Sequence, residues 1–164
     1  MSFKSEKEMS KSFKAYFSKE LKCTGACVIE ECKGLFGIPD YVVVENDKNE
    51  LKNIVAIELK IKNWKRALIQ AFKYKSFAHK SIVVIDENFK HRALKNIEDF
   101  KRLKIGLASF NSGKEFVIHY MPEQDNPFSA SYYDVIRSQI RKKSSKPKIK
   151  TSLESKLNQI SFAN

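Results

Sequence analysis

The stretch Ile54-Val-Ala-Ile-Glu-Leu-Lys-Ile61 is the most informative part of this 164-residue chain. It is a short apolar run of the kind that forms a buried strand, so the charged residues Glu58 and Lys60 inside it need a physical reason. Side chains alternate between the two faces of a strand, and residues 58 and 60 therefore share one face. The sequence predicts a carboxylate and an ammonium group side by side on a buried sheet.

A second carboxylate stands upstream of this strand. Pro39-Asp40 opens the Val-rich segment 40–45, which reads as a neighbouring strand joined to 54–61 by the polar turn 46–50. Asp40 would then stand beside Glu58 and Lys60. Two converging carboxylates are the minimum for holding a hard divalent cation, which lowers the pKa of an attacking water.

An amphipathic helix is expected directly after the strand, from Trp64 to about His79. Its apolar positions share one helical face, which predicts packing on the sheet: Trp64, Ala67, Leu68, Ala71, Phe72 and Ala78. Gln70 and Tyr74 are four residues apart and so lie on one flank of this helix.

The rest of the chain continues the alternation of helices and strands. Helices are expected at 5–21, 90–103 and 129–141, and strands at 26–31, 81–86, 105–109 and 115–120. This order predicts an α/β fold with a mixed β-sheet flanked by helices on both faces. We expect one core over residues 1–122, followed by a C-terminal helix and a basic tail over residues 123–164.

Together these residues resemble the active site of the PD-(D/E)xK nuclease superfamily, the restriction-endonuclease-like fold. Gln70-x-x-x-Tyr74 looks like the Gln-x-x-x-Tyr element of its RecB-like branch. The resemblance implies that Asp40, Glu58 and the Leu59 carbonyl bind Mg²⁺, with Mn²⁺ as a substitute, and that Lys60 orients or deprotonates the water. Gln70 would contact the metal-water network or a DNA phosphate.

The resemblance also implies a supporting acid on the first helix or first strand, for which Glu20 and Glu31 are the candidates and Glu6 and Glu8 lie further back along the helix. Members of the branch often carry a His on the first helix, whereas His79, His91 and His119 all lie elsewhere. For Glu58 and Lys60 alone, the alternative is a simple ion pair on an edge strand. For Gln70 and Tyr74, it is a surface amide and a half-buried ring.

The amino-acid composition indicates which kinds of partner the protein can bind. The chain has 31 Lys and Arg against 19 Asp and Glu, a net charge of +12, which favours a polyanion as partner, although lysines that merely solvate the surface give the same count. DNA is the expected partner, and RNA stays open. No apolar run approaches a membrane span and residues 1–8 lack a signal-peptide core, so we expect a cytoplasmic protein.

The three cysteines, Cys23, Cys27 and Cys32, lack the paired spacing of a zinc site and the fourth ligand of an iron–sulfur cluster, so we expect structural roles for them.

The function expected from the sequence is a magnesium-dependent DNA endonuclease of the restriction, defence or repair type. A Holliday-junction resolvase, which would work as a homodimer, is one alternative. A non-catalytic nucleic-acid-binding module of the same fold is the other. The basic run 141–150 would add phosphate contacts, unless the apolar residues beyond it form a last helix that packs on the domain or on a second subunit: Leu153, Leu157, Ile160 and Phe162.

Overall fold

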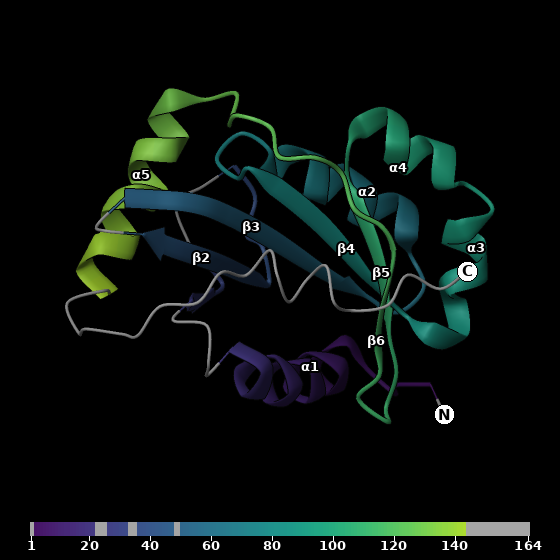
Figure 1. The fold of residues 1–164 in the computed structure, drawn as a ribbon. Helices are drawn as coiled ribbons and strands as arrows, with labels where there is room; N and C mark the ends of the chain where they lie inside the picture. Colours follow the sequence, from purple (N-terminus) through teal and green to yellow (C-terminus); the bar gives the residue numbers. More distant parts are fainter. Residues whose placement is uncertain (1, 22–25, 33–35, 48–49, 144–164) are drawn as a thin grey trace.

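The computed structural model of the chain describes residues 2–21, 26–32, 36–47 and 50–143 (Figure 1). Within these residues the protein is an α/β structure with one six-stranded mixed sheet, whose strands lie in the order of the sequence. The strands are β1 (Cys27–Glu30), β2 (Tyr41–Asp47), β3 (Glu50–Lys60), β4 (Lys80–Asp86), β5 (Gly106–Phe110) and β6 (Phe116–Tyr120). The first three pair antiparallel, β3, β4 and β5 run parallel, and β6 returns antiparallel.

Five α-helices occur in the described part of the chain: α1 (Glu6–Leu21), α2 (Trp64–Tyr74), α3 (Lys90–Leu94), α4 (Ile97–Leu103) and α5 (Ala130–Lys143). A 3₁₀ turn (Glu87–Phe89) precedes α3. The expectation of a single helix over 90–103 is wrong, because the chain breaks between α3 and α4. The Asn96 side chain donates to the Arg92 carbonyl, a local bond that competes with helical continuation.

Alternation along the strands divides the core into two clusters. Met9, Phe13 and Phe17 of α1 pack with odd-numbered residues of β2 and β3, such as Val43 and Ile57. The apolar side of α2 packs with even-numbered residues of the same strands: Val42, Val44, Ile54 and Ala56. Glu58 and Lys60 are even-numbered, so the period of two places them on the side of the sheet that packs with α2, and Asp40 lies just before the start of β2.

The C-terminal part described here belongs to the same core. Ile136 and Ile140 of α5 are buried in the cluster that contains α2. Cys32 is buried, and its thiol donates to Oε1 of Gln139 at 2.7 Å, which agrees with the structural role expected for it. Cys23, most of the basic run 141–150 and the apolar residues beyond it lie outside the described residues.

Candidate active site

Asp40 and Glu58 are brought together by the register of β2 and β3. Tyr41 pairs with Ile57 at the end of this antiparallel ladder, and the same register continued by one residue sets Asp40 near Glu58, whose pKa its charge raises. Side chains directly opposite on one face lie about 5 Å apart at Cβ, and two like charges there destabilise the sheet. Glu58 is only 2% exposed. The fold therefore holds two carboxylates together where both repulsion and burial oppose it.

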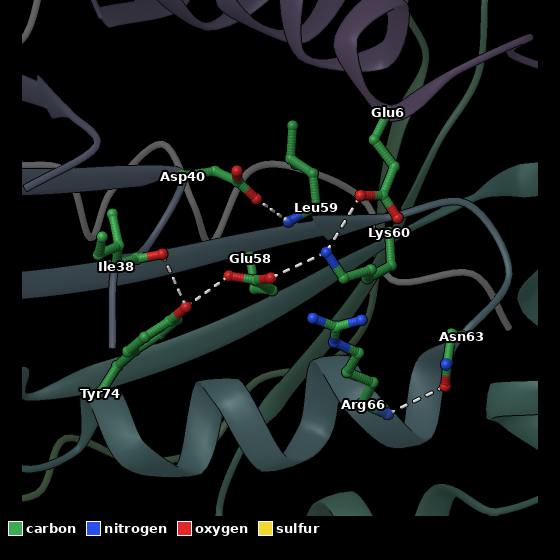
Figure 2. A network of polar contacts seen from close by, with 9 residues as sticks. All are labelled: Glu6, Ile38, Asp40, Glu58, Leu59, Lys60, Asn63, Arg66 and Tyr74. Carbon is green, nitrogen blue, oxygen red and sulfur yellow. Dashed lines mark hydrogen bonds and ion pairs between the residues drawn. The ribbon is translucent and has the colours of Figure 1, made fainter. Parts of the chain in front are cut away.

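Asp40 lies just before the start of β2 and bonds across to β3. Its Oδ2 accepts the Leu59 backbone N–H at 2.7 Å (Figure 2). The N–H and C=O groups of one strand residue point to the same neighbour, so the Leu59 carbonyl also faces the Asp40 side, beyond the end of the β2–β3 ladder. Among the described residues, Oδ1 of Asp40 has no hydrogen-bond partner.

Tyr74, at the end of α2, holds the other carboxylate. Its hydroxyl lies 2.6 Å from Oε2 of Glu58 and 3.0 Å from the Ile38 carbonyl oxygen (Figure 2). The Tyr74 hydroxyl has one proton but lies within hydrogen-bond distance of two acceptors. If Glu58 were protonated, its proton could bond to the Tyr74 oxygen, and the Tyr74 proton could bond to the Ile38 carbonyl. Gly37 has a φ of +90°, and a Cβ there would stand 2.8 Å from Cε1 of Tyr74, so the turn needs glycine to pass this ring.

Lys60 contacts two acids, one in β3 and one in α1. Its Nζ lies 3.1 Å from Oε1 of Glu58 and donates to Oε2 of Glu6, the first residue of α1, at 3.2 Å. The Lys60 side chain is 13% exposed. The ammonium group therefore stands at the mouth of the site, between the buried carboxylate and an exposed one.

The pKa values of these groups follow from burial and mutual charge. Burial raises the pKa of Asp40, and the charges of Glu6 and Glu31 add to this effect. Burial also raises the pKa of Glu58, and the charge of Asp40 adds to it, although the hydroxyl of Tyr74 works in the opposite direction. Burial alone would lower the pKa of Lys60, but Glu58 and Glu6 outweigh it, so the pKa of Lys60 is raised.

α2 carries a polar flank that faces the acids. Arg66, Gln70 and Tyr74 are spaced by four residues and so follow one stripe along the helix. The Gln70 side chain lies close enough to the Tyr74 hydroxyl to act on the pKa of Tyr74, and its Oε1 is buried without a hydrogen-bond partner. Figure 2 shows the Arg66 guanidinium pointing from α2 toward Glu58 and Lys60. The sequence interpretation missed Arg66, although its spacing from Gln70 was a signal for it.

The supporting acids are placed unequally. Glu31 follows β1, has a φ of +41°, and acts electrostatically on Asp40. Glu6 reaches Lys60, although the sequence ranked it below Glu20. Glu20 lies fourteen residues further along α1, about 20 Å at the rise of a helix, and its charge acts on Tyr16 instead. The structure thus brings Glu6 and Glu31 toward the acids, and places Glu20 away from them.

The oxygen atoms at the candidate site are of the type that binds a hard divalent cation. Asp40 offers one unengaged carboxylate oxygen, Glu58 offers oxygens now shared with Lys60 and Tyr74, and the Leu59 carbonyl faces the same space. Oxygen donors of this type suit Mg²⁺, which keeps several waters and takes one or two carboxylates. No group of three or more His, Cys, Asp or Glu residues with metal-site geometry occurs in the described residues, so the protein would supply few ligands.

Comparison with protein-family models, with curated proteins and with solved structures found no match for this chain. Among the helices that the structure describes, none has the length and apolar character needed to cross a membrane.

Proposed function

We propose that this protein is a magnesium-dependent nuclease that hydrolyses phosphodiester bonds of DNA, on a restriction-endonuclease-like fold in which helices cover both faces of the sheet. The observation that carries the proposal is the Asp40–Glu58 pair. A sheet gains no stability from a buried acid, Glu58, beside a half-buried one, Asp40, whereas a cation site requires such a pair. The net charge of +12 supports a polyanionic substrate.

Each residue has a part in this chemistry. A divalent cation held by Asp40, Glu58 and the Leu59 carbonyl would acidify a water and neutralise charge on the phosphate. Lys60, held 3.1 Å from Glu58, orients the attacking water and stabilises negative charge on the phosphate oxygens as the phosphorus–oxygen bond forms. Tyr74 fixes the rotamer of Glu58, and Gln70, which lies close to the Tyr74 hydroxyl, would contact the metal-water network or a DNA phosphate.

Cleavage of supercoiled plasmid in Mg²⁺, in Mn²⁺ and in a chelator tests the proposal. We expect nicking by the wild type only with metal, no cleavage by Asp40→Asn or Glu58→Gln, and strongly slowed cleavage by Lys60→Met. Glu98→Gln, which removes an equally charged but exposed carboxylate on α4, is the matched control and should cut normally. Full activity of Asp40→Asn would contradict the site assignment.

The same assay separates the alternatives. A binding module without catalysis would retard the plasmid in the gel but would leave the plasmid uncut in Mg²⁺ and in Mn²⁺. A single-stranded RNA substrate tests whether RNA replaces DNA, and a four-way junction tests the resolvase alternative, which also predicts a homodimer in size-exclusion chromatography.

A further inference from the structure

Arg66 is a cation beside the candidate site whose guanidinium has no partner among the described residues (Figure 2). Lys60 is engaged by Glu58 and Glu6. The other three lysines near this side of α2 each lie over an aromatic ring: Lys62 over Phe89, Lys65 over Trp64 and Lys73 over Phe36. The guanidinium of exposed Arg66 makes no hydrogen bond, ion pair or ring contact in the described residues.

The backbone around Arg66 is fixed. Oδ1 of Asn63 accepts the Arg66 N–H at 3.1 Å and caps the first turn of α2 (Figure 2). Three residues separate the end of β3 from the start of α2, so this turn is tied closely to Lys60. Two turns further along the same flank, Tyr74 bonds to Glu58. The flank is therefore held at both ends, and the guanidinium is aimed at the acids without being neutralised by them.

We propose that Arg66 binds a non-bridging oxygen pair of the phosphodiester that is being cut, so that the phosphate is oriented over Glu58 and Lys60. The planar guanidinium donates two parallel N–H bonds to a phosphate, which a lysine cannot do. Charge supports this role. The acids Asp40, Glu58 and Glu6 carry three negative charges, which Lys60 and one divalent cation would balance. Arg66 then adds a positive charge that attracts a phosphate. This proposal rests on the proposed function.

Three variants test it: Arg66→Lys keeps the charge without the fork, Arg66→Gln removes both, and Lys65→Gln removes a neighbouring charge whose side chain lies over Trp64. At saturating DNA we expect single-turnover cleavage to fall about 10-fold in Arg66→Lys and about 100-fold in Arg66→Gln, and to be unchanged in Lys65→Gln. A role for charge alone predicts instead that Arg66→Lys cuts like the wild type, which would overturn the proposal.

A second readout needs neither metal nor cleavage. The affinity for a short DNA duplex is measured in a chelator over a series of salt concentrations. Loss of one phosphate contact lowers the slope of log affinity against log salt by about one. We expect this decrease in Arg66→Gln and not in Lys65→Gln. An equal slope in the wild type and Arg66→Gln would refute the phosphate contact, even if cleavage by the wild type depends on Asp40. If the wild type does not cut DNA, the proposed function fails and this slope alone decides the role of Arg66.

Discussion

At the scale of single residues, the Asp40–Glu58 pair costs the folded protein stability. Burial and neighbouring charge raise the pKa of both acids, so the folded chain holds these protons more tightly than the unfolded chain does. As pH rises from about 4, the unfolded chain loses such protons first, and the folded state loses stability until the raised pKa is passed. The two acids therefore lower the free energy of unfolding of the metal-free protein near neutral pH.

Asp40→Asn should therefore stabilise the metal-free protein near neutral pH. The Asn Oδ1 can still accept the Leu59 N–H, while the repulsion of Glu58 disappears. We expect a gain of about 0.5–1 kcal/mol in the free energy of unfolding at pH 7, which vanishes below about pH 4, where the wild-type carboxyl is protonated. Urea unfolding at several pH values measures it. A loss of stability at pH 7 would show that the Asp40 charge is well compensated.

Tyr74→Phe should keep the packing of the ring and remove only the hydroxyl. The carboxylate of Glu58 would lose a donor that lowers its pKa, so the pKa of Glu58 should rise further. We expect a loss of about 1–2 kcal/mol in stability and a shift of the acid limb of the cleavage profile to higher pH. An unchanged pH profile would mean that Tyr74 does not act on Glu58.

The sequence predicts those parts of the site that depend on residues close together in the chain, and not those that depend on distant ones. Alternation along a strand is enough to predict that Glu58 and Lys60 share a face, and helical spacing predicts the Gln70–Tyr74 flank. Glu6 was undervalued because its contact with Lys60 depends on where the N-terminal segment is held, and that is decided by residues more than eighty positions away. No local pattern carries such information.

At the scale of elements, Asp86 holds the start of the chain. This fully buried residue ends β4, and its two oxygens accept four hydrogen bonds, from the Ser2 hydroxyl, the Phe3 N–H and both the backbone and side chain of Asn88. Burial would raise the pKa of Asp86, but these donors outweigh it and lower it. The segment so anchored leads into α1, whose first residue, Glu6, contacts Lys60.

Asp86→Asn should release this segment, because one amide oxygen cannot replace two carboxylate oxygens. We expect a loss of about 2 kcal/mol in stability at neutral pH. The pKa of Asp86 is lowered, so its contribution is full above the unfolded pKa of about 3.9 and disappears as pH falls through the folded value. The difference between wild type and variant should therefore shrink in strong acid. A pH-independent difference would assign the loss to packing instead.

The helices show the limit of periodicity. An amphipathic pattern predicted α1 and the start of α2 to within one residue, but it could not show that Asn96 would divide the segment 90–103, because the apolar positions continue in phase across the break. The end of α2 at Tyr74 was also missed. Residues 76–79 stay buried in the turns that lead into β4, and burial alone does not distinguish such turns from a helix.

At the scale of the whole molecule, the net positive charge is the property that favours a polyanionic partner. With a net charge of +12, DNA binding should weaken steeply with added salt, because phosphate contacts release counterions. Fluorescence anisotropy between low and moderate salt measures the slope. A nearly flat slope would mean that the lysines only solvate the surface.

The contribution of the basic tail can be tested by a truncation after residue 143, since α5 up to that point places Ile136 and Ile140 in the core.

We propose that Asp40 and Glu58 together hold a divalent cation, and thermal unfolding in increasing Mn²⁺ tests this claim. A cation that binds only the folded chain raises the midpoint in proportion to the logarithm of its concentration above the dissociation constant. We predict that the wild type, which unfolds at a lower temperature than Asp40→Asn without metal, gains stability with Mn²⁺ while the variant does not. An equal Mn²⁺ response in the wild type and Asp40→Asn would contradict the claim.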